Sequence, residues 1–242
     1  MENIYFHIKH IFLFLPLILL CLNFYGIFAK KVFKKKLFVK TNKGLNGDKG
    51  YDWALNFCDF ETLVKKIHEN IVHFQRENKN YCPIYENYIL FMLSFLPINH
   101  FKNYEFYNIK RIISVGYGLC SQVCILLYLC LKKKNINSKI VGFKGHVLVH
   151  VTANKQDFLL DPDYGVVLNF HPTDVKRNIH RILADYKKKI GEDRIKQLKC
   201  VFKSNYEYIP EKVIKRNIIL ENICYLLKWL MPFIIFFLIK IN

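Results

Sequence analysis

Two long apolar runs near the ends of the chain constrain its fold more than any other feature. The first, Ile11 to Ala29, contains nineteen residues and no acidic or basic side chain. A helix of that length crosses the roughly 30 Å of hydrocarbon in a bilayer. The second run, Ile223 to Ile239, is apolar except for Lys228, and Pro232 lies one turn further along. We therefore predict an N-terminal membrane anchor and a second membrane segment at the C-terminus.

Each run also has an alternative interpretation. A cleaved signal peptide begins in the same way, but here the positive charge follows the run, and Ile27-Phe28-Ala29 does not fit the small-residue pattern of a cleavage site. The C-terminal run also fits an interfacial or re-entrant helix, in which Lys228 extends to the membrane surface. We expect the first run to be retained as an anchor and the second to span the membrane.

Lysines follow the first apolar run at once and indicate the orientation of the chain. Residues 30–43 contain no acidic residue and seven lysines: Lys30, Lys31, Lys34, Lys35, Lys36, Lys40 and Lys43. Because basic residues accumulate on the cytoplasmic side of membrane segments, we expect the middle of the chain to lie in the cytoplasm. A general excess of lysine along the chain would produce the same pattern and is the alternative.

The whole chain is strongly basic, with 37 Lys and Arg against 19 Asp and Glu and a formal net charge of +18. Such a charge is typical of proteins that bind nucleic acid or an anionic membrane surface. The lysines, however, occur in nearly every segment, and no recognisable nucleic-acid-binding motif accompanies them. We therefore expect membrane lipids and a substrate as partners, and no nucleic acid.

The cysteines do not form a pattern that predicts disulfides or a zinc ribbon. There are eight: Cys21, Cys58, Cys82, Cys120, Cys124, Cys130, Cys200 and Cys224. A disulfide framework is typical of short secreted chains, and this chain of 242 residues is neither short nor rich in turns. The absence of a Cys-x-x-Cys pair argues against zinc-ribbon and thioredoxin-like sites. Any reactive cysteine must therefore be identified from its local sequence.

The segment between the apolar runs begins with linker-like and helical patterns. Thr41 to Gly50 is rich in Gly and Asn and predicts a linker. Apolar residues at three-to-four spacing predict a first helix from Asp59 to Phe74 and an aromatic-rich second helix from Pro83 to Leu96. Leu119 to Lys134 is apolar nearly all round and predicts a buried third helix. Thr173 to Ile190 predicts a further helix.

A period of two replaces the helical pattern after the buried helix. Apolar residues alternate from His146 to Val151 and again from Asp157 to Asp161, which predicts a β-hairpin. A turn at Ala153-Asn154 places residues opposite each other when their numbers sum to 307, so His146 faces Asp161 directly. Directly opposed side chains lie within about 5.5 Å at Cβ. The hairpin therefore predicts an imidazole beside a carboxylate.

Cys120 lies at the start of the buried helix, four residues after Gly116 and two after Gly118. The unpaired N–H groups and the dipole of a helix N-terminus stabilise a thiolate, the form of cysteine that attacks carbonyl groups. Glycines allow a sharp turn and leave room for a substrate beside the sulfur. An imidazole oriented by a carboxylate accepts the thiol proton. We therefore predict Cys120 as the nucleophile, His146 as the base and Asp161 as the residue that orients the base.

A family resemblance appears in the same residues. The sequence GYGLCSQVCILLYLCLKKKNINSKIVGFKGHVLVHV, followed by FLLDPDYGVV, resembles the transglutaminase-like superfamily of papain-related thiol enzymes. These enzymes combine a cysteine at a helix start with a histidine and an aspartate on successive strands. The resemblance extends from Gly116 to Val167 and is most specific at Gly145-His146 and Leu160-Asp161-Pro162. It implies the same three catalytic roles for Cys120, His146 and Asp161.

The sequence also departs from the family pattern. Val147 replaces the aromatic residue that often follows the family's histidine, and His150 stands where the family often has an acidic residue, so no catalytic role passes to it. The short connection from cysteine to histidine implies a core without the calcium-site insertions of the animal enzymes. Arylamine acetyltransferases share the triad and have a motif similar to Asp161-Pro162-Asp163-Tyr164-Gly165. The Arg-Gly-Gly-x-Cys motif around their cysteine is absent from this sequence.

Together these patterns predict an α+β fold with a transglutaminase-like, papain-like core. In this core the buried helix that carries Cys120 packs on a small antiparallel sheet beginning at Ile140, and N- and C-terminal membrane helices flank it. The expected boundaries are an anchor at 1–29, a basic linker at 30–50, the transglutaminase-like domain at 51–218 with its core at 111–170, and the C-terminal membrane segment at 219–242.

The expected activity is thiol-dependent acyl transfer or hydrolysis on a peptide, amide or ester, without a cofactor. Cys120 attacks the carbonyl, His146 protonates the leaving group, and water or an amine resolves the thioester. The backbone N–H of Cys120, with the side chain of Tyr117 or Gln122, is expected to stabilise the oxyanion. The alternative function is a catalytically silent scaffold or binding protein at the membrane.

A metal site is the competing chemistry. Cys120 and Cys124 lie one helical turn apart, and His146 and His150 have the same separation in sequence. Two residues four apart on a strand, however, lie about 13 Å from each other, too far to share one zinc ion. We therefore expect no metal at these residues, a core-packing role for Cys124 and Cys130, and a position for His150 that is displaced toward the hairpin turn.

Overall fold

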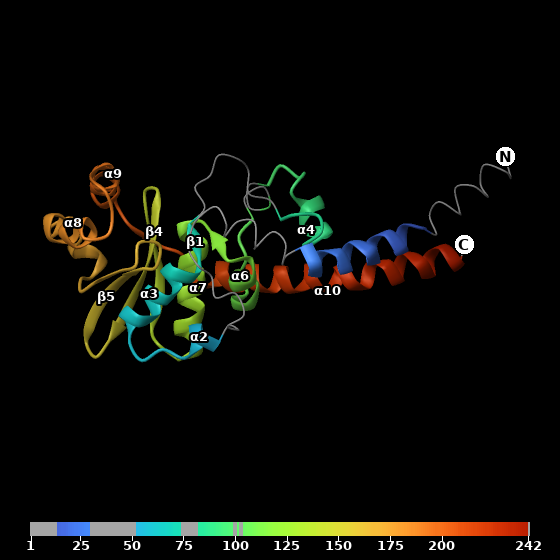
Figure 1. The fold of residues 1–242 in the computed structure, drawn as a ribbon, viewed down its shortest axis with the longest axis horizontal. Helices are drawn as coiled ribbons and strands as arrows, with labels where there is room; N and C mark the ends of the chain where they lie inside the picture. Colours follow the sequence, from blue (N-terminus) through green and yellow to red (C-terminus); the bar gives the residue numbers. More distant parts are fainter. Residues whose placement is uncertain (1–13, 30–51, 74–81, 99–100, 102–103, 242) are drawn as a thin grey trace. The chain divides into compact units, whose positions relative to one another are not determined.

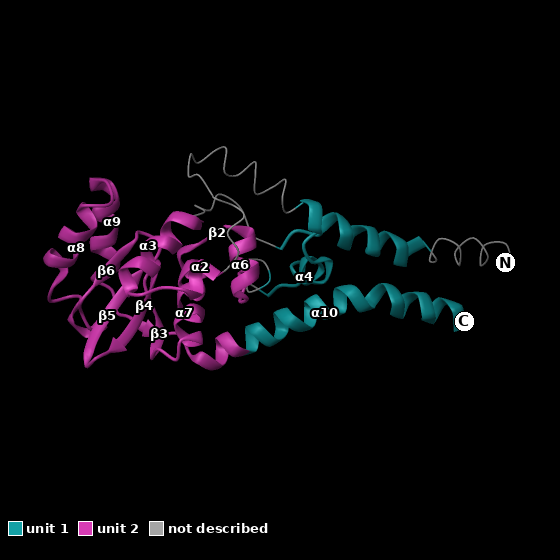
Figure 2. Cartoon of the chain, turned by 60° about the horizontal axis from the view of Figure 1, so that its bottom comes forward, with its two compact units in different colours: residues 1–40, 76–104, 216–242 teal, residues 41–75, 105–215 magenta. Residues whose placement is uncertain are grey.

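A computed structural model describes most of the chain and divides it into two units (Figures 1 and 2). The described residues are 14–29, 52–73, 82–98, 101 and 104–241. Unit 1 comprises 1–40, 76–104 and 216–242, and unit 2 comprises 41–75 and 105–215. The lysine cluster and the linker predicted at 30–50 lie outside the described residues. The segment 76–104, which the predicted domain included, belongs to unit 1.

Unit 2 contains the antiparallel sheet. Its strands are β3 (Ser138–Phe143), β4 (His146–Ala153), β5 (Gln156–Asp161), β6 (Val166–Leu168) and β7 (Glu207–Tyr208). They lie in the order β6-β5-β4-β3-β7, and every neighbouring pair is antiparallel (Figure 1). The prediction of an α+β fold with a small antiparallel sheet is therefore confirmed. The edge strands β6 and β7 are too short to produce a recognisable alternating pattern.

The turn between β4 and β5 differs from the predicted one. Ala153 pairs with Gln156, so the turn residues are Asn154 and Lys155, both with positive φ of 50° and 61°. Two such residues form the left-handed type of turn that matches the twist of a hairpin. The predicted turn at Ala153-Asn154 is therefore wrong by one position. Because this error shifts the register by two residues, an even number, each side chain still points to its predicted face.

One face of the sheet packs against α7 (Cys120–Lys133) and α3 (Phe60–Asn70), as Figure 1 shows. Val149, Val151 and Leu160 on this face are fully buried. The ring of Phe158 meets that of Phe60 edge-on, with centroids 5.4 Å apart. The valine face of the hairpin thus packs against apolar helices, as its alternating pattern predicts.

The opposite face packs against α8 (Ile179–Lys187) and α9 (Glu192–Phe202). The buried residues of this layer include Val141, Phe143, Leu148, Leu159, Val166, Leu168, Ile182, Tyr186 and Phe202. The helix predicted from Thr173 to Ile190 is present as α8, but it begins six residues later than predicted. The chain forms a 3₁₀ turn, η1 (Pro172–Asp174), and buries Val175 in the core before α8 begins.

Local hydrogen bonds determine the limits of α3. Asp59 caps the helix, because its carboxylate accepts a hydrogen bond from the Thr62 N–H at 2.6 Å. The helix ends at Asn70 rather than at the predicted Phe74, since the N–H of Val72 donates to the carbonyl of Gly116 at 2.9 Å. This bond begins a parallel pair of two short strands, β1 (Val72–His73) and β2 (Tyr117–Gly118).

Unit 1 contains a helix at Phe14–Ala29, the short helix α4 (Tyr88–Leu93), and α10 (Glu211–Ile241) from residue 216 onward. The helix predicted from Pro83 to Leu96 is shorter, because the Asn87 side chain caps α4 by accepting from the N–H groups of Ile89 and Leu90. By length and composition α10 can cross a membrane, whereas Phe14–Ala29 is apolar but shorter. Residues 11–13 of the predicted anchor lie outside the described residues.

Pro232 explains how the N-terminal helix pairs with α10. A proline inside a helix has no N–H for the carbonyl four residues earlier, here that of Lys228. This carbonyl instead accepts hydrogen bonds from Asn23 Nδ2 at 2.7 Å and from the Tyr88 hydroxyl at 2.6 Å. The two donors join three segments that are far apart in sequence.

Removing these donors should destabilise unit 1. Asn23→Ala and Tyr88→Phe should each cost about 1 kcal/mol, because the other donor still satisfies the Lys228 carbonyl. The double variant should cost more than the sum, since both of these hydrogen bonds to a buried carbonyl are then lost together. Unfolding of the full chain in detergent measures the cycle, with Cys21→Ala, an exposed position on the same helix, as the control. Strict additivity would contradict the shared role of the two donors.

Candidate active site

Cys120 is the first residue of α7 and is half-buried. The preceding helix, α6 (Ile109–Val115), ends at Gly116, which adopts the left-handed conformation with φ of 74°. The chain then passes through β2 and enters α7 at Leu119. The N-cap residue of α7, Leu119, makes no side-chain cap hydrogen bond. The positive end of the α7 dipole therefore lies beside the Cys120 sulfur, where it favours an anion.

Gln122 supports the backbone just ahead of Cys120. Its side chain is buried, its Oε1 accepts from the Phe106 N–H at 2.9 Å, and its Nε2 donates to the Tyr117 carbonyl at 2.7 Å. The amide is therefore used within the fold, and the prediction that Gln122 donates to an oxyanion is not supported by this arrangement. Gly118 must lack a side chain here, because a Cβ would lie 2.8 Å from Nε2 and 2.9 Å from Cβ of Gln122.

His146 and Asp161 form a buried hydrogen bond. Nε2 of His146 lies 2.6 Å from Oδ2 of Asp161, and the two side chains are 5% and 0% exposed. The residues are not directly opposite in the ladder, where Val149 pairs with Leu160, so the predicted pairing is wrong. They lie diagonally on the same face, which imidazole and carboxylate side chains can bridge.

Further donors surround the Asp161 carboxylate. The Tyr186 hydroxyl, from α8, donates to Oδ2 at 2.6 Å, and the N–H groups of Asp163 and Tyr164 donate to Oδ1 at 3.1 and 3.2 Å. Burial, together with the neighbouring carboxylate, raises the pKa of Tyr186 well above its usual value, which keeps the phenol protonated as a donor. His68 of α3 holds the following loop through a 2.8 Å contact from Nδ1 to the Asp163 carbonyl.

The environment of His146 favours its protonated form. Burial alone lowers the pKa of His146, but the charge and hydrogen bond of Asp161, together with the Cys120 thiol, raise it well above its usual value. Nε2 is engaged by Asp161, and the imidazole also interacts with the Cys120 side chain. The three predicted residues are therefore brought into one interacting group.

The other cysteines of α7 are in different environments. Cys124 is buried, its Sγ donates to the Val147 carbonyl at 3.1 Å, and burial raises its pKa well above the usual value. Burial also raises the pKa of Cys130 to about 12. Both are consistent with core packing. His150 hydrogen-bonds Asp157 at 2.9 Å and lies toward the turn, so the two cysteines and two histidines of the competing metal hypothesis do not converge.

Comparisons of this chain with protein-family models, curated protein sequences and solved structures found no match. The transglutaminase-like resemblance therefore stays a prediction.

Gly118→Ala should disturb this site. A Cβ at position 118 requires Gln122 to move, which loosens the Phe106 and Tyr117 contacts and shifts the start of α7. We expect a loss of about 1–3 kcal/mol in stability and a marked fall in Cys120 reactivity. Thermal unfolding and alkylation rates measure these effects. Gly191→Ala, where a Cβ meets nothing within 4 Å, is the control, and equal effects in both variants would contradict the proposed fit.

Asp161→Asn should lower the pKa of His146, because the amide cannot supply the negative charge that raises it. The folded pKa lies above the unfolded value of about 6.5, so protonation stabilises the fold fully below that pH and this contribution is lost as the pH rises through the folded pKa. In the variant the loss should occur at lower pH. NMR titration of labelled histidine, assigned with His146→Gln, measures the shift. An unchanged His146 titration would contradict the role of Asp161.

Proposed function

We propose that this chain is a membrane-anchored cysteine enzyme that catalyses acyl transfer or hydrolysis on an amide or ester. The nucleophile is Cys120, the acid and base is His146, and Asp161 orients the imidazole. The observation that carries the proposal is the buried 2.6 Å bond between His146 and Asp161 next to a cysteine at a helix N-terminus. A nucleophile, a base and an orienting acid in this order are the recurring parts of covalent acyl-transfer catalysis.

The first half of the reaction forms a thioester. Cys120 gives its proton to Nδ1 of His146, and the thiolate attacks the substrate carbonyl carbon. The resulting oxyanion is stabilised by the main-chain N–H groups at the start of α7. The intermediate collapses when the bond to the leaving group breaks, and His146 transfers its proton to the departing nitrogen or oxygen. Asp161 holds the imidazolium by accepting from Nε2–H throughout.

The second half regenerates the enzyme. Water or an amine enters the position that the leaving group vacated, and His146 accepts a proton from it as it attacks the thioester carbonyl. The C–S bond breaks, and the thiolate regains its proton from the imidazolium. The product is a carboxylic acid when water attacks and a new amide when an amine attacks.

The fold supports a transglutaminase-like assignment for this site. A cysteine on a helix that packs on an antiparallel sheet, followed by a histidine at the start of one strand and an aspartate at the end of the next, is the arrangement that the sequence resemblance implies. Peptide, amide or ester substrates follow from the same resemblance.

Membrane attachment is supported by α10 and by the Asn23 contact that joins the apolar helix Phe14–Ala29 to it. A pair of apolar helices hydrogen-bonded to each other inside hydrocarbon is a stable arrangement. The lysines at 30–43 support a cytoplasmic position for the catalytic residues. The enzyme would then act on substrates at the inner surface of the membrane.

Selective alkylation tests the proposed nucleophile. In the full chain at pH 6, iodoacetamide should modify Cys120 at least about 10-fold faster than the exposed Cys200, since a thiolate–imidazolium pair reacts at a pH where an ordinary thiol does not. His146→Ala should remove this advantage. A generic activated ester should give a burst of one leaving group per chain that disappears in Cys120→Ala. A burst that persists in Cys120→Ala, or slow uniform labelling of all exposed cysteines, would favour a non-catalytic scaffold.

A further inference from the structure

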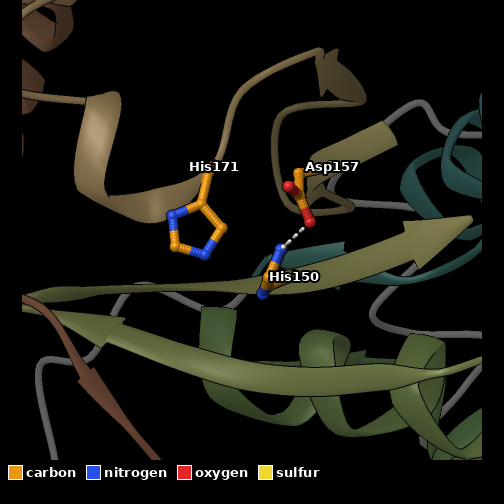
Figure 3. Close-up of side chains that lie close together, drawn as sticks. All are labelled: His150, Asp157 and His171. Atoms are coloured by element: carbon orange, nitrogen blue, oxygen red, sulfur yellow. Dashed lines mark hydrogen bonds and ion pairs between the residues drawn. The ribbon is translucent and has the colours of Figure 1, made fainter. Parts of the chain in front are cut away.

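A second polar cluster lies on the same sheet, nearer the hairpin turn. His150 comes from β4, Asp157 from β5 and His171 from the segment that precedes η1. Nε2 of His150 lies 2.9 Å from Oδ1 of Asp157, and the two imidazole rings are edge-to-face with centroids 4.9 Å apart (Figure 3). One ligand-type atom from each of the three residues lies within 4.8 Å of the other two.

A hydroxyl group contacts Nδ1 of each imidazole ring and so fixes the direction of the ring. The Tyr208 hydroxyl lies 2.9 Å from Nδ1 of His150, and the Thr173 hydroxyl lies 2.7 Å from Nδ1 of His171. In each ring, Nδ1 thus has an oxygen partner and Nε2 is the nitrogen that would coordinate; in His150 this nitrogen contacts Asp157, itself a proposed ligand. Metal-bound histidines typically have this arrangement, in which the outer partner selects the tautomer and the ring direction.

We propose that His150, Asp157 and His171 bind one divalent transition-metal ion, with Zn²⁺ the best fit, and that water completes the coordination. Two imidazole nitrogens and one carboxylate oxygen are a frequent zinc ligand set. A tetrahedral site with bonds of 2.0–2.1 Å separates its ligand atoms by about 3.4 Å, so small side-chain rotations from the present geometry are sufficient. Ca²⁺ and Mg²⁺ fit less well because they prefer oxygen ligands throughout.

A second donor also faces the ring of His171. The Thr173 N–H lies 3.3 Å from Nδ1 of His171. Coordination through Nε2 would place a proton on Nδ1, so the bond from the Thr173 N–H would be given up and Nδ1–H would donate to the Thr173 hydroxyl instead.

The proposed ion is separate from the thiol chemistry. His146 and His150 lie four residues apart on one strand, which separates them by about 13 Å. The ion therefore does not act on the carbonyl that Cys120 would attack, and the proposal does not depend on the proposed enzymatic function. Its position joins the β4–β5 hairpin to the segment after β6, so its role is to stabilise unit 2.

Cobalt spectroscopy and zinc competition test this site in the full chain, purified in detergent after chelation and reduction. Co²⁺ should bind at one ion per chain and give visible bands without the near-ultraviolet band of thiolate ligation, and Zn²⁺ should displace it. Asp157→Asn and His171→Ala should weaken binding at least about 100-fold, and Tyr208→Phe about 10-fold. His180→Ala, which changes an exposed histidine outside the cluster, should bind as the wild type does.

Stability provides a second measurement. Zn²⁺ should raise the melting temperature of the wild type and leave that of Asp157→Asn unchanged, with circular dichroism showing that the variant is folded. Three results would overturn the proposal: no stoichiometric binding by the wild type, unchanged affinity in both ligand variants, or a thiolate band from coordination by cysteine. If the wild type binds no ion, the three side chains are held by their own hydrogen bonds, such as that between His150 and Asp157, and do not form a metal site.

Discussion

The buried Asp161 carboxylate is the group on which the two layers of unit 2 depend. A carboxylate without solvent is costly unless donors surround it, and here the imidazole of His146, the hydroxyl of Tyr186 and two main-chain N–H groups supply them. Tyr186 belongs to α8, so the helical layer over one face of the sheet completes the hydrogen bonding of a residue at the end of β5. The same bonds that satisfy the charge also fix the direction of the imidazole.

The proximity of His146 and Asp161 could be predicted even though the turn was predicted wrongly. An error of one position in a hairpin turn shifts the register by two, and a shift of two keeps every side chain on its face. The faces followed from the alternation of Val149 and Val151 with the histidines, which a sequence displays directly. Cys120 could be predicted for a similar reason, since glycines before an apolar helix are a local signal. Features that depend on residues close together in sequence, namely the strand faces and the cysteine at the helix start, could therefore be predicted.

Contacts between distant segments could not be predicted. Tyr186 lies 25 residues from Asp161, and nothing in the local sequence distinguishes it from other tyrosines of amphipathic helices. Gln122 was expected to face a substrate, whereas two main-chain groups, one of them 16 residues away, engage its amide. His171 lies 21 residues after His150 without a local motif around it, and its position beside His150 follows from the path of the chain after β6. Each of these depends on tertiary packing rather than on pattern.

The proline in α10 has a consequence for how the two apolar helices are aligned along their length. It leaves one main-chain oxygen at a fixed position along a largely apolar helix, and the side chains of Asn23 and Tyr88 both donate to it. Sliding the helix Phe14–Ala29 by a single turn, about 5.4 Å, would break the Asn23 bond to that oxygen while the Tyr88 hydroxyl keeps its place. In a regular helix the Lys228 carbonyl would be bonded within the helix, whereas here it accepts from Asn23 and so fixes the axial alignment of the pair. In this way a helix of about 24 Å is held in register against a longer one.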